Sequence, residues 1–253
     1  MSDDVISPGP LQSPDQTGET LHEDQSVNRL RHRANRGLGR HLAMELIKRG
    51  ATVYAGSRDP DAVDLPGATP VTLDITDLAS VEAAARAASD TTLLINNAGS
   101  STGADLLHGD PVKIRLEMDT HFFGTLSVVR AFAPKIAANG GGTIVNILSV
   151  LSWVSFPQAG AYCAAKSAEW SMTNALRTQL AGQQIRVAGL HVGYMDTDMA
   201  ASVTAPKADP EDIAAIAMTA LSTTLMRSLP TRPAAKCKPP SPAGFRCSTP
   251  AGP

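Results

Sequence analysis

The chain has 253 residues, with 22 Lys and Arg against 24 Asp and Glu, and a formal net charge of −2 at neutral pH. This length suffices for one large α/β domain, and the balanced charge gives no electrostatic argument for nucleic-acid binding. We find no apolar run long enough for a membrane-spanning helix and no secretory signal pattern. The three cysteines, Cys163, Cys237 and Cys247, fit no disulfide framework and no metal spacing. We therefore expect a cytoplasmic protein without a metal site.

Composition divides the chain into three regions. Residues 1–33 are rich in Asp, Ser, Gln and Pro without periodicity, which is typical of disorder. Residues 34–226 alternate apolar runs with helical patterns, and they form the predicted folded domain. Residues 227–253 are basic and rich in proline, unlike anything before them.

The middle region predicts strands and helices in strict alternation. In chain order, helical spacing covers residues 40–50, 80–88, 117–138, 161–182 and 209–221, and strand-like runs cover 51–57, 69–76, 91–99, 141–149 and 185–193. Such alternation predicts an α/β fold, a single doubly wound parallel sheet with helices on both faces. Ligands of these sheets bind at the carboxyl ends of the strands.

The segment "ANRGLGR" resembles part of a phosphate-binding loop that opens a helix. Gly37 and Gly39, with Leu38 between them, would let the backbone approach a pyrophosphate at a helix N-terminus, although a structural loop is an equal reading. A buried strand should precede this loop. Residues 29–33 read Arg-Leu-Arg-His-Arg, which suits no buried strand. We therefore expect the first strand of the sheet to be missing or replaced.

Two arginines suggest which dinucleotide would bind. A basic residue after the second strand suits a 2′-phosphate. Arg58 lies 19 positions after Gly39, and Arg36 lies within the loop. Both favour NADP(H), and the alternative is that they are solvated surface arginines.

The strongest pattern is Ser149 followed by "YCAAK". Tyr162 and Lys166 are four residues apart, so they share one helix face. A lysine ammonium near a tyrosine stabilises the phenolate and makes it usable in acid–base catalysis. Ser149 ends the preceding strand and can donate a hydrogen bond to a carbonyl oxygen. Together these three residues would polarise a ketone and protonate its oxygen.

These motifs resemble the short-chain dehydrogenase/reductase family, of the classical NADP(H)-preferring type with one Rossmann-like domain. The resemblance covers residues 34–226 and rests on the order and spacing of "ANRGLG", "LDITD", "NNAG", Ser149, "YCAAK" and "HVGYMDTDM". It implies an NADP(H)-dependent oxidoreductase that transfers a hydride between nicotinamide and a carbonyl or alcohol substrate. It also implies a homo-oligomer.

The resemblance assigns cofactor contacts residue by residue. Asp74 would contact the adenine end, Lys166 the nicotinamide ribose, and Thr197 the carboxamide from a loop that begins at Gly193. The predicted cofactor-binding set is Arg36, Gly37, Leu38, Gly39, Arg58, Asp74, Asn97, Ala98, Gly99, Tyr162, Lys166, Gly193 and Thr197. For Asn97, an ordinary turn after a strand is the plainer reading, which does not exclude the family role.

The sequence departs from the family pattern in three places. His32 and Arg33 replace the Thr-Gly of the phosphate loop, and Val192 replaces a proline. His121 stands where the family usually has a catalytic Asn that orders a proton-relaying water. An imidazole could exchange protons at neutral pH, or His121 could merely fill the space. His121 joins Ser149, Tyr162 and Lys166 as the predicted catalytic set.

Two other functions remain open from sequence. One is a non-catalytic NADP(H)-binding regulator on the same fold, although such a protein has no need of Ser149 with Tyr162. The other is an inactive product of a frame-shifted dehydrogenase gene, with residues 1–33 and 227–253 as frame-shifted ends. With suitably chosen synonymous codons, residues 28–33 read one base later encode Thr-Ala-Phe-Val-Thr-Gly, an apolar strand that ends in the missing Thr-Gly.

Overall fold

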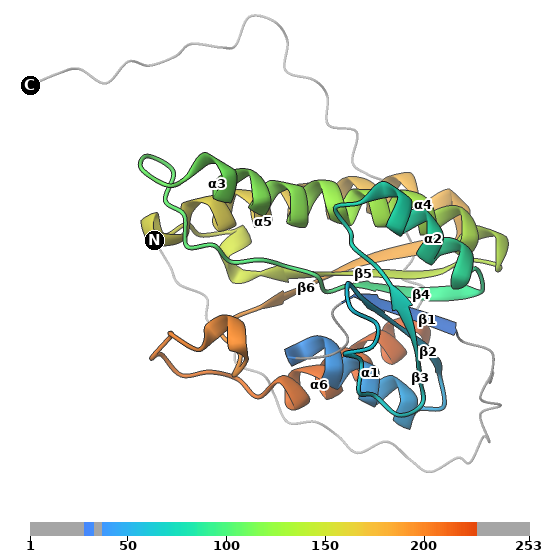
Figure 1. The fold of residues 1–253 in the computed structure, drawn as a ribbon. Coiled ribbons are helices and arrows are strands. Elements are labelled where there is room, and N and C mark those ends of the chain that lie inside the picture. The colour runs from blue at the N-terminus through green and yellow to red at the C-terminus, as the bar shows by residue number, and fades with distance from the viewer. Residues whose placement is uncertain (1–27, 33–36, 227–253) are drawn as a thin grey trace, which may run out of the picture.

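The computed structural model describes residues 28–32 and 37–226. Outside the described residues lie residues 1–27 of the predicted disordered segment 1–33, residues 33–36 of the phosphate loop, and the Pro-rich segment 227–253. The described strands form a parallel sheet in the order β3-β2-β1-β4-β5-β6 (Figure 1). The strands are β1 (Asn28–His32), β2 (Thr52–Ser57), β3 (Ala68–Thr72), β4 (Thr91–Asn96), β5 (Gly142–Ser149) and β6 (Ile185–Val192).

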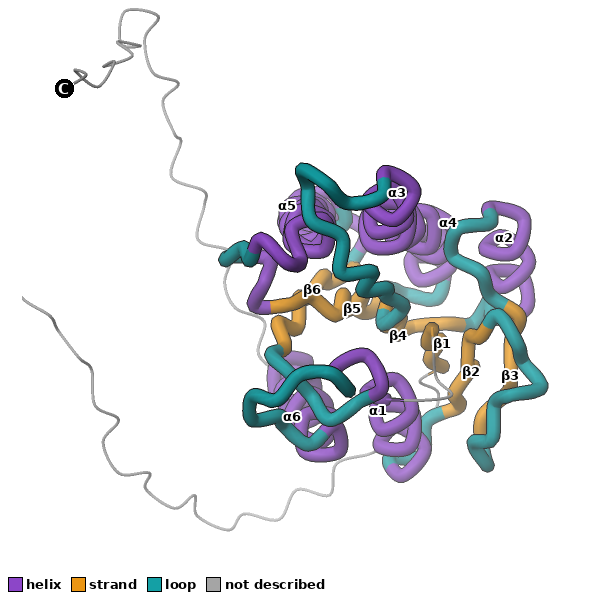
Figure 2. The backbone as a smooth tube through the Cα atoms, turned by 60° about the vertical axis from the view of Figure 1, so that its left-hand side comes forward, coloured by secondary structure: helices purple, strands orange, loops and turns teal. Residues whose placement is uncertain are grey.

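Helices cover both faces of this sheet, as the alternating pattern predicts. The helices are α1 (Gly37–Lys48), α2 (Leu78–Ala87), α3 (Pro111–Met118), α4 (Thr125–Ala138), α5 (Gly160–Gln179) and α6 (Pro210–Met226). Figure 2 shows α1 and α6 on one side of the strands and α2, α4 and α5 on the other. Each layer has its own apolar core: Phe132 and Ile136 are fully buried in one, and Leu42 and Leu46 in the other. The fold is therefore the predicted single doubly wound α/β domain.

The place of the first strand is occupied. The backbone of Asn28–His32 pairs in parallel with β2 on one side and β4 on the other. This differs from the expectation that residues 1–33 lack structure. Strands β2 and β4 would otherwise each present a row of unpaired N–H and C=O groups, which any extended segment of suitable length can fill. The backbone of Asn28–His32 therefore adopts the geometry of the first strand, although its residue types are unsuited to a buried strand.

The helix predicted over residues 117–138 begins earlier and contains an irregular turn. Helices α3 and α4 are joined without a break by a π-helical turn over Asp119–Gly124. Gly124 packs closely against the loop after β3, because an added Cβ would lie 2.9 Å from Ile75 Cδ1. Such π turns widen a helix locally and often lie at functional sites. This one carries His121.

Candidate active site

Ser149 is the last residue of β5, at the carboxyl edge of the sheet, and it is buried. Its Oγ accepts a hydrogen bond of 3.1 Å from the backbone N–H of Leu151, in the short helical turn Val150–Ser152 that directly follows Ser149. The hydroxyl hydrogen is not used in that bond. This bond fixes the Ser149 side chain, and its O–H remains available to donate a hydrogen bond to a carbonyl oxygen.

Tyr162 and Lys166 lie one turn apart near the start of α5. Tyr162 is half-buried and its ring meets the His121 ring edge-on, with centroids 5.2 Å apart. Lys166 is buried and donates hydrogen bonds to the carbonyl oxygen of Ile147 on β5, at 2.7 Å, and to Glu169, at 2.6 Å. The lysine is therefore fixed between α5 and β5, and one of its three N–H groups is left for another partner.

His121 is fully buried beside this pair. Its Nε2 lies 2.9 Å from the carbonyl oxygen of Ser100 and 3.3 Å from Oε2 of Glu117, the residue one turn earlier. Burial and the nearby Lys166 ammonium lower the pKa of His121, although the two carboxylates near it act in the opposite direction. Gly99 makes room for the ring, because an added Cβ there would lie 2.9 Å from His121 Cε1.

Glu117 is a buried carboxylate at the end of α3. Burial by itself would raise the pKa of this group, but hydrogen bonds from His121, Ser100 and Thr102 outweigh burial and hold it at about 2. The Ser100 hydroxyl donates to Oε2 over 2.7 Å, and the Thr102 backbone N–H donates to Oε1. Glu117 is therefore ionised at neutral pH and anchors the loop after β4.

The loop residues predicted to hold a dinucleotide gather at the same edge of the sheet. Gly37 starts α1 with a φ of 53°, a left-handed conformation that suits glycine, and an added Cβ would lie 3.3 Å from Thr197 Cγ2. Leu38 and Gly39 are buried in the first turn of α1. The approach of Gly37 to Thr197 brings the phosphate loop beside the predicted carboxamide loop, in which Gly193 is exposed.

The predicted adenine end also assembles. Arg58 is exposed just after β2. Asp74 follows β3 and accepts two hydrogen bonds from Thr76. Burial would raise the pKa of Asp74, but these bonds and the positive charge of Arg58 lower it. The carboxylate and the guanidinium are therefore close enough to interact across the ends of two neighbouring strands.

The segment "NNAG" serves the site in two ways. Asn96 is buried and donates to Asn146 Oδ1 on β5 over 2.8 Å, so its side chain joins two strands. Asn97 and Ala98 are half-buried at the strand end, and Gly99 passes against His121. The predicted cofactor contacts Asn97, Ala98 and Gly99 therefore follow directly after the carboxyl end of β4.

A model of the family described as short chain dehydrogenase matches residues 33–208. The chain belongs to the short-chain dehydrogenase family. Members of this family are oxidoreductases that act on alcohol or carbonyl groups with a nicotinamide dinucleotide, and this chain is an oxidoreductase of that class.

Two curated relatives are reductases. D-erythrulose reductase of Gallus gallus is 33% identical over 174 residues, 66% of this chain and 70% of that protein. NADPH-dependent 1-acyldihydroxyacetone phosphate reductase of Schizosaccharomyces pombe is 32% identical over 169 residues, 64% of this chain and 57% of that protein. This chain thus spans little more than half the length of the second relative.

A solved structure supports the fold. A short chain dehydrogenase from Burkholderia cenocepacia J2315, in complex with NADP, is 38% identical with a TM-score of 0.75. The match covers 78% of this chain and 84% of that one. The Rossmann-like dehydrogenase fold is therefore shown by sequence and by structure.

Sequence reasoning missed two buried glutamates of this dehydrogenase. Glu169 lies three residues after Lys166, and Glu117 lies four residues before His121, so both share a helix face with a predicted catalytic residue. Both spacings are visible in the sequence and could have predicted these contacts. It also missed the stacking of Trp153 on His191, with ring centroids 4.0 Å apart, beside the carbonyl group of Ser149.

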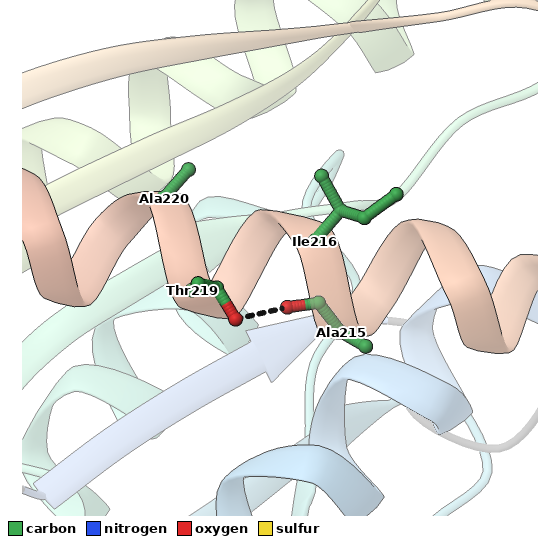
Figure 3. A pocket seen from close by; sticks show the side chains of 4 residues that line it. All are labelled: Ala215, Ile216, Thr219 and Ala220. Carbon is green, nitrogen blue, oxygen red and sulfur yellow. Dashed lines mark hydrogen bonds between the residues drawn. The ribbon is translucent and has the colours of Figure 1, made fainter. Parts of the chain in front are cut away.

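A shallow pocket on α6 has no part in this site. Its lining residues are Ala215, Ile216, Thr219 and Ala220, and Figure 3 shows them along one stretch of the helix. The Thr219 hydroxyl donates to the Ala215 carbonyl oxygen, 2.9 Å away within the helix. The pocket carries no titratable group, and α6 covers the sheet face opposite α5. In the part of the chain that the structure describes, no helix is long and apolar enough to cross a bilayer.

Proposed function

We propose that this dehydrogenase is NADP(H)-dependent, with Tyr162 as the acid and base at the substrate oxygen and Ser149 as the donor that orients this oxygen. The observation that carries the proposal is the cluster of side chains at the end of β5 and the start of α5. Lys166 is tied to β5 through Ile147 O, one turn after Tyr162, and the His121 ring packs against the tyrosine. Residues that only bound a dinucleotide would not require this arrangement.

The chemistry divides between the cofactor and the protein. When bound, the dinucleotide supplies or accepts the hydride. In the reductive direction the Ser149 hydroxyl donates a hydrogen bond to the substrate carbonyl, which draws charge onto the oxygen. The Tyr162 hydroxyl then gives its proton to that oxygen, and the Lys166 ammonium stabilises the phenolate left behind.

The preference for NADP(H) is supported by charge at the adenine end. Arg58 is exposed beyond β2, where it can form charge-assisted hydrogen bonds to a 2′-phosphate. The NADP complex of the Burkholderia cenocepacia relative and the NADPH dependence in the name of the yeast relative agree with this assignment. Arg36 is proposed as a second phosphate contact from sequence alone, because it lies outside the described residues.

Replacement of Tyr162 by phenylalanine tests the proposal. We expect Tyr162→Phe to lose at least about 100-fold in kcat on a panel of ketones and aldehydes, because general acid catalysis is typically worth that much. NADPH affinity, measured by fluorescence, should stay within about twofold, because only the phenol oxygen is lost. A variant that kept more than about a tenth of the parent rate would remove Tyr162 from the acid role.

The parent protein in the same assay separates the two alternatives. NADPH binding without turnover on a broad panel would indicate a regulator. Absence of NADPH binding would indicate the inactive product of a frame-shifted gene. Turnover with NADPH supports the proposed oxidoreductase.

A further inference from the structure

Three aromatic rings meet beside Ser149. Trp153 directly follows the short helical turn Val150–Ser152, Trp170 lies on α5, and His191 lies on β6. The Trp153 ring stacks on the His191 ring, with centroids 4.0 Å apart and an angle of 23° between the planes. Trp170 meets both of these rings edge-on. The cluster therefore connects three elements, and the proposed chemistry gives none of its rings a part.

His191 contacts Ser149 through a hydrogen bond. Its Nδ1 lies 3.1 Å from the backbone carbonyl oxygen of Ser149. Because a carbonyl oxygen only accepts hydrogen bonds, Nδ1 carries the hydrogen and donates it. His191 directly precedes Val192, the register partner of Ser149 in the parallel pairing of β5 with β6. The imidazole thus connects the last residue of β5 to the neighbouring strand.

Trp153 holds the imidazole in this orientation. Trp153 is 57% exposed, so burial in a core does not fix its ring, and its stacked contact with His191 does. The indole covers one face of the imidazole and keeps water from that face. A hydrogen bond with fewer competing water molecules is stronger. The stack therefore supports the bond between His191 and Ser149.

The turn after β5 transmits the position of the Ser149 carbonyl group to the Ser149 hydroxyl. The backbone N–H of Leu151, two residues on, donates to Ser149 Oγ over 3.1 Å. On α5, the Ser167 hydroxyl donates to the carbonyl oxygen of Ser152 over 3.0 Å and holds the end of this turn. A shift of the Ser149 carbonyl group would also move the N–H that holds the Ser149 hydroxyl. His191 therefore acts on the side chain of Ser149 through the backbone.

We propose that His191 is a positioning residue for Ser149: its Nδ1–H fixes the Ser149 carbonyl group and thereby the direction of the Ser149 hydroxyl. The proposal rests on the proposed function, in which this hydroxyl donates to the substrate oxygen. A reacting group misplaced by about 1 Å can lose on the order of 100-fold in rate. His191 exchanges no proton in this role, since Nδ1 donates whether the ring is neutral or charged.

The experiment compares His191→Leu with His191→Asn in the full chain. Leucine fills space without a donor, whereas asparagine can place its side-chain nitrogen where Nδ1 lies and donate from there. We expect His191→Leu to lower kcat about tenfold or more with unchanged NADPH affinity, and His191→Asn to recover most of kcat. His108→Leu, the same change at an exposed residue before α3, is the matched control and should match the parent.

Two kinetic results would overturn the proposal. One is equal kcat in His191→Leu and the parent, because the hydroxyl would then need no help from His191. The other is a lowered kcat that His191→Asn does not restore, because a merely structural role of the ring would give that result.

Hydrogen exchange tests the positioning without turnover. The Leu151 amide donates to Ser149 Oγ, so its exchange rate reports how firmly this hydroxyl is held. We expect the exchange of Leu151 to be about twofold to tenfold faster in His191→Leu than in the parent. In His191→Asn it should equal the parent, and the amide of Leu94, in β4, should not change in either variant. Unchanged exchange of Leu151 in His191→Leu would contradict the proposal.

Nitrogen NMR of the His191 ring tests the hydrogen bond itself. We expect the neutral ring to carry its hydrogen on Nδ1, and a neutral ring with its hydrogen on Nε2 would overturn the proposal. If the parent turns over no substrate, the proposed function fails, while hydrogen exchange and the position of this hydrogen still decide the role of His191. Turnover by the parent together with Leu151 exchange that ignores His191→Leu would keep the proposed function and remove His191 from it.

Discussion

At the residue scale, Glu117 shows how a site gains rigidity from a buried charge. Burial removes water from the Glu117 carboxylate, and hydrogen bonds from Ser100 and Thr102, in the loop after β4, replace the lost contacts with water. Its pKa of about 2, against an ordinary 4.5, means that folding favours the ionised form. The stabilisation is therefore complete above pH 4.5 and is lost as the pH falls from 4.5 to about 2.

The acid stability of Glu117→Gln follows from this linkage. At neutral pH we expect the variant to lose about 1–3 kcal/mol of unfolding free energy, because donors around the site lose a charged acceptor. Below pH 4.5 the difference from the parent should shrink, since protonation removes the same charge from the parent. Urea unfolding of the variant and the parent across this pH range measures the difference in unfolding free energy. A difference that stays constant with pH would contradict the linkage, and Glu82→Gln, at an exposed residue of α2, gives the baseline.

Cofactor choice is a second residue-scale property, and we propose that Arg58 decides it. We expect the parent to prefer NADPH over NADH in kcat/KM, and Arg58→Asp to abolish this preference, since a carboxylate repels the 2′-phosphate. Arg86→Asp, an equal change of charge on the exposed surface of α2, should keep the preference. Equal kcat/KM of the parent with both cofactors would refute the assignment.

Residue-scale sequence reasoning predicts which side chains lie together where this depends on spacing along one helix. Tyr162 and Lys166 are predictable because four positions on one helix define a face. Glu169 was predictable by the same rule. The contact of Gly99 with His121 was not, because it depends on how the loop after β4 passes the π-helical turn, and no local pattern encodes this packing.

At the element scale, side chains connect β4, β5 and α5 beneath the site. Asn96 donates to Asn146 over 2.8 Å, and Asn146 donates to Thr173 over 2.9 Å. All three are buried, so each bond satisfies a group that has no access to water. The strands and α5 were predicted from apolar runs and helical spacing. The π turn was not, because helical spacing in the sequence does not distinguish a π turn from the α-helix around it.

Removal of Asn146, the central residue of these hydrogen bonds, should lower the free energy of unfolding. We expect Asn146→Leu to lose on the order of 2–3 kcal/mol of unfolding free energy, because a buried amide donor on Asn96 is left without an acceptor. The double variant Asn96→Leu with Asn146→Leu should recover part of that loss, since both polar partners are then gone. Denaturant unfolding measures both. A double variant less stable than Asn146→Leu would argue that the bond is not the source of the cost.

At the scale of the whole molecule, the sheet order places β1 between β2 and β4, with helices covering both faces of the sheet. Central strands of such sheets are apolar on both sides. The segment at β1 is Asn-Arg-Leu-Arg-His, which contains two arginines. Sequence reasoning anticipated this conflict from residue types. It did not anticipate that the backbone would still pair, because the pairing requirement comes from the neighbouring strands.

Restoring an apolar strand should therefore stabilise the whole domain. The variant combines Asn28→Thr, Arg29→Ala, Leu30→Phe, Arg31→Val, His32→Thr and Arg33→Gly, which is the sequence that the shifted frame offers. Charged groups in a covered sheet cost several kcal/mol each, so we expect Tm to rise by about 5 °C or more and NADPH affinity to increase. Arg29→Lys with Arg31→Lys keeps the charge and should bring no gain. A combined variant with unchanged Tm would show that this strand tolerates its arginines. Sequencing of the coding DNA completes the test: if the codons, read one base on, do not give an apolar strand that ends in Thr-Gly, the frame-shift hypothesis is wrong.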